Sequence, residues 1–441
     1  MESRPLVHRR IESALVRLSS PYFALHDFLR DAVLYGLSGL FGVVVAFTSN
    51  LALYREWGAM AAPTYFLAML SLLVAYRRYR SADEAPCFRF RLVIAAIVVT
   101  GALVVPLAME VSWRTSTPNP YLHVQPEVTG IERAGKDMAL AKDPYHLVEK
   151  FPEATNPAND TTFEKFFPYL PLMAVFGYAS STTAPVEVTD ARVTFTLVTL
   201  VIGGAAIALA QLSRRRRLSL AQFLVVLPMG SLPLVTGGDD LPVLALLLLG
   251  LVLMERERDL PAGVMFGLAA ALKFTAWPIA VLSVIFVAAT RPKKTRLLMG
   301  AGFMGVLIPI VLPYSIMNPA AFVQNVILFP LGLSGVESPA ASPLVGHFIV
   351  TLLPGFHQAY VVLIAVVGVA MFARRLIRHT PSIGADVATL AGWCAMFAVV
   401  VAPSTRVGYL IYPLNFFLWG ACLGASKNAS ISSMRFETVE S

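Results

Sequence analysis

The sequence has few charged residues. Only 14% of its 441 residues are Asp, Glu, Lys or Arg, and 56% are hydrophobic, whereas about a quarter of a soluble domain is charged. Apolar runs of about 18 residues or more recur along the chain, and a helix needs roughly that length to cross a bilayer. These features exclude a soluble globular fold and predict an all-α polytopic membrane protein.

Cysteines are scarce, and no metal-ligand spacing is recognisable. Cys87 lies in a basic stretch, whereas Cys394 and Cys422 lie in apolar runs. No pair is placed to form a disulfide bond outside the cytoplasm, and no spacing of Cys, His and carboxylates is typical of a metal site. We therefore expect no cofactor, although the available carboxylates leave a divalent metal open.

The sequence also lacks an internal repeat and a recognisable signal peptide. The missing repeat weakens the interpretation of the chain as an inverted-repeat transporter. The segment MESRPLVHRRIESALVRLSS at residues 1–20 has neither a compact apolar core nor a cleavage site. We expect it to form a basic arm in the cytoplasm.

Basic residues are present in excess, with a formal net charge of +8. They occur in short clusters between apolar runs, which is typical of cytoplasmic loops and not of a surface that binds nucleic acid. After the N-terminal arm, the clusters are RRYRSADEAPCFRFR (77–91), SRRRR (213–217), ERER (255–258), RPKKTR (291–296) and ARRLIRH (373–379). All are predicted to be cytoplasmic.

The apolar runs between these clusters predict about twelve membrane spans in a cell membrane, with both chain ends in the cytoplasm. The predicted spans are 32–53, 59–76, 93–112, 192–211, 218–235, 241–254, 261–273, 275–290, 298–316, 357–374, 385–402 and 408–425. Residues 163–180 are expected to form a juxtamembrane or re-entrant helix. We divide the chain into an arm with two additional spans (1–92), a main membrane domain (93–425) and a cytoplasmic tail (426–441).

Most conspicuous polar residues outside the basic clusters fall on the predicted extracytoplasmic side. They lie in a long loop at 113–190, in VTGGDDLP (235–242), in ALKFTAWP (271–278), and in segments 318–343 and 402–413. A loop as long as the first is usually functional or disordered. Its aromatic residues and prolines favour order, so we expect the functional site on this face.

Glu127 is the first candidate for a catalytic residue. It follows Pro126 in HVQPEV, soon after the third predicted span, where a carboxylate could act as a general base near the membrane surface. A solvated loop acid is the alternative interpretation. That alternative applies more strongly to Glu132 and Asp143, since residues 127–142 look helical and their charges could face water.

Several segments, taken in order, resemble glycosyltransferase family 87, a family of actinobacterial GT-C enzymes that use polyprenyl-phosphate sugars. Glu127-Val-x-x-Ile131 followed by KDPY (142–145) resembles the family's first extracytoplasmic loop, in which an acid precedes the aspartate of DPY by sixteen residues. The other matching segments are FFPYLPLMAVFG (166–177), TGGDDLPVLALLLLGL (236–251), LPAGVMFGLAAALKFTAWP (260–278) and TRVGYLIYP (405–413). The resemblance covers about residues 110–415.

The resemblance implies a GT-C-like helical bundle and an inverting sugar transfer. Glu127 would be the base, and Lys273 and Arg406 would bind the donor phosphate, although both could instead extend to the membrane interface. The family's acid is usually Asp and is followed four residues later by Tyr, where this chain has Glu127 and Ile131. Glu132 therefore stays open as the competing base.

The other candidate substrate-binding residues have structural alternatives. Asp239 and Asp240 could instead cap the following helix, and His347 could be an interfacial histidine. Asp143 could belong to a turn, and the aromatic residues could lie at the membrane interface. The complete set of candidate substrate-binding residues is Glu132, Asp143, Tyr145, Tyr169, Asp239, Asp240, His347 and Tyr409.

By this resemblance the substrates are a polyprenyl-phosphate-linked sugar and a glycolipid or polysaccharide of the cell envelope. Mannose is the expected sugar, which makes the chain an actinobacterial mannosyltransferase-like hexosyltransferase, and arabinofuranose is the alternative. A lipid or solute transporter and an inactive scaffolding homologue are the competing classes of function. A transporter predicts ionisable residues near the middle of the bilayer, whereas this sequence has its acids in the predicted extracytoplasmic loops.

Overall fold

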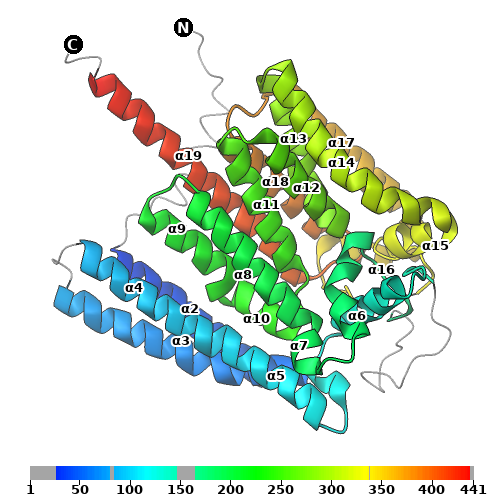
Figure 1. Cartoon of the computed structure of the whole chain (residues 1–441), viewed down its shortest axis with the longest axis horizontal. Coiled ribbons are helices and arrows are strands. Elements are labelled where there is room, and N and C mark those ends of the chain that lie inside the picture. Colours follow the sequence, from blue (N-terminus) through cyan, green and yellow to red (C-terminus); the bar gives the residue numbers. More distant parts are fainter. Residues whose placement is uncertain (1–25, 80–83, 147–163, 337, 438–441) are drawn as a thin grey trace.

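The computed structural model describes residues 26–79, 84–146, 164–336 and 338–437. These residues form helices joined by loops and contain no strand; one isolated bridge joins Ala341 to Thr405. The all-helical prediction is therefore confirmed for the described part of the chain (Figure 1).

The N-terminal helices form an antiparallel group. Helix α2 (Asp27–Thr48) packs along α3 (Ala52–Tyr79). A third long helix continues from α4 (Glu84–Val99) through the π-helical turn η1 (Thr100–Val104) into α5 (Val105–Ser116).

The loop after α5 contains several short helical elements among its described residues. They are η2 (Pro120–His123), α6 (Pro126–Ala139), η4 (Pro171–Ser181) and α7 (Val186–Thr189). The 3-10 helix η4 overlaps the segment that was predicted to be juxtamembrane or re-entrant (163–180), and its 11 residues are too few for a complete span.

The remaining helices form the larger part of the bundle. In chain order they are α8 (Ala191–Leu209), α9 (Arg214–Ala221), η5 (Gln222–Val226), α10 (Pro228–Thr236), α11 (Asp240–Glu255), α12 (Asp259–Leu272), η6 (Phe274–Ala276), α13 (Trp277–Thr290), α14 (Lys293–Met317), α15 (Pro319–Val323), η7 (Gln324–Leu328), α16 (Val345–Leu352), η8 (Pro354–Phe356), α17 (His357–Arg378), α18 (Gly384–Val401), η9 (Val407–Leu410) and α19 (Ile411–Glu437).

Each of the twelve predicted spans coincides with helical structure, but the helices differ in length. Among the described residues, 9 helices are long and apolar enough to cross a membrane. The predicted spans 241–254, 261–273 and 275–290 correspond to the shorter helices α11, α12 and η6–α13. With nine such helices in the part of the chain that the structure describes, this is a multi-pass membrane protein.

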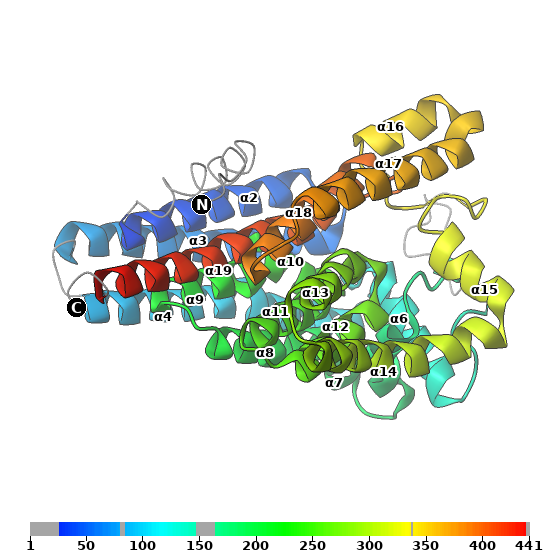
Figure 2. The ribbon, with the colours of Figure 1, turned by 90° about the horizontal axis from the view of Figure 1, so that it is seen from above.

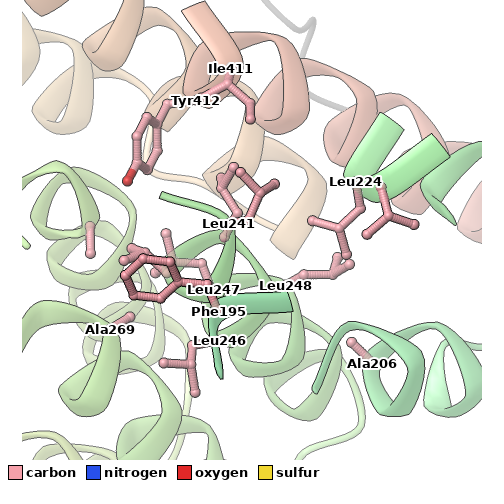
Figure 3. Close-up of a cluster of buried hydrophobic side chains, with 14 of the residues drawn as sticks. Phe195, Ala206, Leu224, Leu241, Leu246, Leu247, Leu248, Ala269, Ile411 and Tyr412 are labelled. Atoms are coloured by element: carbon pink, nitrogen blue, oxygen red, sulfur yellow. The ribbon is translucent and has the colours of Figure 1, made fainter. Parts of the chain in front are cut away.

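Helix α11 is short because it lies in the interior of the bundle. Leu241, Leu247 and Leu248 are at most 1% exposed and pack around Phe195 of α8 and Tyr412 of α19 (Figure 3). A helix that is apolar on every side is typical of such a buried position. By contrast, large apolar side chains on several of the long helices are exposed, as expected for lipid-facing positions; examples are Phe47, Val201, Val369 and Ile377.

The N-terminal helices are tied to the rest of the bundle by buried polar contacts. The Tyr65 hydroxyl on α3 donates a hydrogen bond of 2.6 Å to the carbonyl of Val226 in η5. Arg91 on α4 pairs with Asp27 and Asp31 on α2, and Asp27 also pairs with Arg215 on α9. The first two long helices, which form the two additional spans of segment 1–92, therefore pack against the rest of the bundle.

The segments that were predicted to be extracytoplasmic gather at one end of the bundle. Helices α6, α7, α15 and α16 lie at this end in both views, away from α9 (Figures 1 and 2). The candidate site residues come from this end.

Candidate functional site

Helix α6 carries the candidate base in its first turn. Pro126 occupies the start of the helix, where its missing N–H is not needed, and Glu127 follows it. The backbone N–H of Gln125, just before the helix, donates to the carbonyl of Thr236 at the end of α10 (3.3 Å). This contact fixes the start of α6 against the bundle.

Two glycines set how closely α6 approaches η4. A Cβ atom on Gly135 would lie 2.2 Å from the carbonyl carbon of Gly177, and one on Gly177 would lie 2.1 Å from the carbonyl oxygen of Ile131. Neither position has room for a larger residue, because the two backbones are in contact. The orientation of α6, and with it that of Glu127, depends on this contact.

Glu127 forms an ion pair with Arg406. Arg406 Nη1 donates to Glu127 Oε1 at 2.5 Å, and the two side chains are 34% and 21% exposed. Arg406 precedes η9, in a loop held by hydrogen bonds from Thr405 N to Ala340 O (2.7 Å) and from Ser342 N to Thr405 O (2.9 Å). The structure therefore joins the proposed base to one of the two proposed phosphate ligands.

Lys273 is held by the two neighbouring aspartates at the start of α11. Its Nζ atom lies 3.0 Å from Asp239 Oδ1 and 2.6 Å from Asp240 Oδ1. The ammonium group also lies 5.3 Å from the centre of the Tyr169 ring and 5.6 Å from that of Tyr409, within the range of cation–π attraction. Four other candidate residues thus surround the Lys273 ammonium group.

Two further side chains complete this environment. The Tyr412 hydroxyl donates to Asp240 Oδ1 (2.7 Å) and accepts a hydrogen bond from Thr275 Oγ1 (2.7 Å). Both residues were outside the predicted site set. Both residues lie in segments that resemble the family, Tyr412 three residues after Tyr409 and Thr275 two residues after Lys273, and these positions were the signal available in the sequence.

Glu127, Arg406, Lys273, Asp239 and Asp240 form one electrostatic group, which we call the acid–base cluster. Burial disfavours the charged form of Glu127, but Arg406 and Lys273 outweigh it and hold the pKa of this carboxyl below its usual range. Burial raises the pKa of Asp239 to about 6 although Lys273 opposes the shift, and Asp240 and Glu127 add to it. Glu127 therefore carries a charge at neutral pH, whereas Asp239 titrates near the physiological range.

Glu132 belongs to a different cluster. Arg114 donates to both of its carboxylate oxygens, at 2.9 and 2.7 Å, and also to Asp190 (2.7 Å). The N–H of Ala191 adds a third hydrogen bond to Glu132 (3.1 Å). Glu132 is five residues from Glu127, so the two side chains point about 140° apart around α6. A cavity of about 400 Å³ borders Arg114 and Glu132.

The same cluster anchors the start of α8. Asp190 caps this helix by accepting a hydrogen bond from the N–H of Arg192 (2.9 Å), and it pairs with the Arg192 side chain. Burial of Asp190 opposes its ionisation, but Arg192 and Arg114 lower its pKa to about 2. With its carboxylate oxygens paired in this network, Glu132 is less suited than Glu127 to accept a proton from a substrate.

Asp143, Tyr145 and His347 lie outside the acid–base cluster. Asp143 Oδ1 accepts a hydrogen bond from Tyr145 N (3.0 Å). This bond forms a turn, which was the structural alternative to substrate binding by Asp143. The Tyr145 side chain is fully buried and its hydroxyl donates to the carbonyl of Tyr169 (2.9 Å). His347, on α16, lies 3.3 Å from the carbonyl of Pro403. Tyr145 thus supports the backbone of Tyr169, a residue that faces Lys273.

The start of α3 also reaches this region, which the sequence did not indicate. The Gln125 side-chain amide donates to the Tyr54 hydroxyl. Tyr54 lies in segment 1–92, and it contacts Gln125, two positions before Glu127.

The chain is similar to a known protein family. The profile of glycosyltransferase family 87 matches residues 167–403, more than half of the 441 residues. The matched range contains Tyr169, Asp239, Asp240 and Lys273, and it ends three residues before Arg406. No curated protein and no solved structure matches the chain. The chain belongs to glycosyltransferase family 87.

Proposed function

We propose that this membrane glycosyltransferase transfers a sugar from a polyprenyl phosphate to a glycolipid or polysaccharide of the cell envelope, with inversion at the anomeric carbon and on the extracytoplasmic side. Mannose is the proposed sugar. The family match supports glycosyl transfer. The observation that carries the finer proposal is the Glu127–Arg406 ion pair in the same cluster as Lys273, since it joins a base to two cations.

In the proposed step, an acceptor hydroxyl oxygen attacks the anomeric carbon while Glu127 takes the hydroxyl proton. The bond between the anomeric carbon and the phosphate oxygen breaks, and its electron pair goes to the phosphate. The phosphate changes from a diester with one negative charge to a monoester with up to two. Lys273 and Arg406 would offset this added charge, which is the kind of electrostatic stabilisation that accelerates such transfers.

Both cations are neutralised by carboxylates in the absence of a donor. Fully ionised, the acid–base cluster has three negative and two positive charges, a net charge of −1. A donor phosphate would therefore have to compete with Glu127 for Arg406 and with the two aspartates for Lys273. Protonation of Asp239, whose pKa is raised to about 6, would remove one of these competitors.

Competition for Arg406 would also activate the base. Among the contacts that lower the pKa of Glu127, the charge of Arg406 is the largest. When Arg406 turns to the donor phosphate, Glu127 loses this stabilisation of its charged form and becomes a stronger base. Donor binding would thus prepare the carboxylate for the proton that it must accept.

Tyr169 and Tyr409 are suited to bind the sugar. Their rings face the Lys273 ammonium group from two different segments of the chain. An aromatic face offers an apolar surface to the C–H groups of a sugar ring, and the hydroxyls remain free to hydrogen-bond. This arrangement would hold the sugar next to the phosphate that Lys273 binds.

The test is transfer by purified protein in lipid nanodiscs. The protein receives radiolabelled polyprenyl-phosphomannose, polyprenyl-phosphoarabinofuranose or GDP-mannose, each with an envelope lipid extract as acceptor. We expect labelled product with the mannose lipid. Product only with the arabinofuranose lipid would contradict mannose as the sugar but would agree with the proposed mechanism. Product only with GDP-mannose would contradict the proposed donor class.

A further inference from the structure

Three potential metal ligands meet outside the acid–base cluster. Glu56 lies near the start of α3, Glu110 lies on α5 and His123 ends η2. One ligand atom from each residue lies within 4.8 Å of the other two. All three positions precede residues 167–403, so the family match assigns them no role.

The distances between the three side chains fit a metal site. His123 Nδ1 lies 3.1 Å from Glu110 Oε2 and 3.3 Å from Glu56 Oε2. Ligands about 2.0–2.1 Å from a tetrahedral ion are about 3.3 Å from each other. The observed spacing would therefore accept an ion with little movement of the side chains.

The protein groups alone do not satisfy this cluster. The Glu110 side chain is fully buried and its Oε1 atom has no hydrogen-bond partner. The buried Oε2 atom of Glu56 also lacks one. Two carboxylate oxygens face a single histidine nitrogen, which can donate at most one proton. A buried carboxylate such as that of Glu110 is costly when its charge is not compensated, so a cation bound between Glu110 and Glu56 would stabilise the fold.

Arg192 lies next to this cluster, but it shares its charge with Asp190. Arg192 Nη1 donates to the backbone carbonyl of His123 (2.8 Å), but its guanidinium also makes two hydrogen bonds to Asp190, of 2.9 and 2.8 Å. Arg192 therefore holds the backbone of His123, while Asp190 balances its charge.

We propose that Glu56, Glu110 and His123 bind a divalent transition-metal ion of the Zn²⁺ type. An imidazole with two carboxylates suits such an ion, whereas Ca²⁺ and Mg²⁺ prefer six or more oxygen ligands. Three protein ligands leave a fourth position for water. The Glu56 side chain is 33% exposed and provides the entry route, whereas His123 and Glu110 are 9% and 0% exposed.

The metal would join three parts of the chain near the candidate base. It would connect α3 and α5 to the segment that leads into α6. In that segment, Gln125 follows His123 by two residues and hydrogen-bonds Tyr54, and Glu127 follows by four. The ion would fix the path of the chain up to the base without touching the substrate, so this site is independent of the proposed transfer reaction.

The first test measures binding to the wild-type protein. Purified full-length protein is treated with EDTA, then titrated with ZnCl₂ and separately with CoCl₂. We expect one Zn²⁺ per chain by elemental analysis, a higher Tm with Zn²⁺, and visible absorption bands of Co²⁺ in a tetrahedral nitrogen–oxygen site. The absence of stoichiometric Zn²⁺ and of Co²⁺ bands would overturn the proposal, whatever the sugar-transfer assay shows.

Variants then locate the site. We expect His123→Gln and Glu110→Gln to weaken Zn²⁺ binding by more than about 100-fold, since the loss of a ligand exceeds the usual effect of a supporting residue. His146→Gln, which changes an exposed histidine in the same loop, should bind Zn²⁺ like the wild type. Full Zn²⁺ binding by the His123 and Glu110 variants would overturn the assignment of these ligands. If the variants fail to fold, the Co²⁺ spectrum of the wild-type protein decides whether the metal site exists.

Discussion

Arg406 Nη1 lies 2.5 Å from Glu127 Oε1, although the two residues are 279 positions apart in the sequence. The family resemblance gives these residues opposite roles, one as a phosphate ligand and one as a base. Their pairing means that neither is free before the donor arrives. Donor binding and activation of the base are therefore coupled in our account, and the predictions below follow from this coupling.

Arg406→Gln should weaken donor binding. A charge-assisted hydrogen bond contributes about 1.5–3 kcal/mol, so we expect the KM for the lipid donor to rise about tenfold or more. The pKa of Glu127 should also rise toward its usual value, because the group that lowers it most is gone. The acid limb of kcat/KM would then move to higher pH.

The control for this variant is Arg256→Gln. Arg256 donates to the carbonyl of Leu209 (2.8 Å) and lies in a predicted cytoplasmic cluster. Its removal should leave the KM and the pH profile unchanged. Equal donor KM values for Arg406→Gln and the wild type would show that Arg406 does not bind the phosphate.

The affinity for the donor should increase as the pH falls from 7 to 5. Burial raises the pKa of Asp239 to about 6 from its usual 3.8, so Asp239 becomes neutral in this range and no longer competes with the phosphate for Lys273. Glu127 stays ionised, because its pKa is lowered. The raised pKa also means that the folded chain holds this proton more tightly than the unfolded chain, so stability from this group is lost as the pH rises through about 6.

Asp239→Asn mimics the protonated form of Asp239 and is compared with the wild-type protein across the same pH range. It should have a low donor KM at pH 7 and lose the pH dependence between 5 and 7, as measured by initial rates at several donor concentrations. An inactive Asp239→Asn protein, with wild-type activity that falls below pH 6, would instead identify Asp239 as the base.

Helix α6 offers a matched pair of glycine variants. Gly135→Ala places a methyl group against the backbone of Gly177, whereas Gly130→Ala meets open space. Overpacking costs about 1–3 kcal/mol, so Gly135→Ala should lower the Tm and reduce transfer by shifting Glu127. Gly130→Ala should keep its activity and become slightly more stable, since alanine favours a helix by about 0.5–1 kcal/mol over glycine. Equal Tm and equal transfer activity of the two variants would show that the α6–η4 contact does not position Glu127.

The membrane orientation is tested by cysteine labelling of whole cells. Ser181, at the end of η4, and Ser213, before α9, are both exposed. A membrane-impermeant maleimide should label Ser181→Cys in intact cells and Ser213→Cys only after permeabilisation. The wild-type protein serves as the background, because it contains Cys87, Cys394 and Cys422. The reverse labelling pattern would put the acid–base cluster in the cytoplasm and contradict the proposed donor side.

The helices could be predicted from the sequence, because an apolar run long enough to span a bilayer is a local property. The contacts that α11, α12 and α13 make are not a local property, because they involve residues distant in the sequence. Their lengths of 16, 14 and 14 residues suit helices packed among others, and the hydrophobic pattern alone does not distinguish this packing from a lipid-facing span.

The candidate site, too, could be predicted from the sequence only in part. The five-residue interval between Glu127 and Glu132 implies different faces of one helix, but the sequence does not say that one face meets Arg406 and the other Arg114. The three proposed metal ligands are 13 and 67 residues apart, counted from His123 back to Glu110 and Glu56. No sequence motif joins them, because their proximity results from the packing of α3 and α5.

The most direct test of the account compares single-turnover and steady-state transfer by the wild type and Glu127→Gln, with polyprenyl-phosphomannose as donor. Glu187→Gln is the control, since Glu187 is an exposed acid in the same loop. We predict that Glu127→Gln lowers kcat by about 10²–10⁴-fold, the usual contribution of a general base, and that Glu187→Gln has no effect. Wild-type turnover by Glu127→Gln would contradict the assignment of Glu127 as the base.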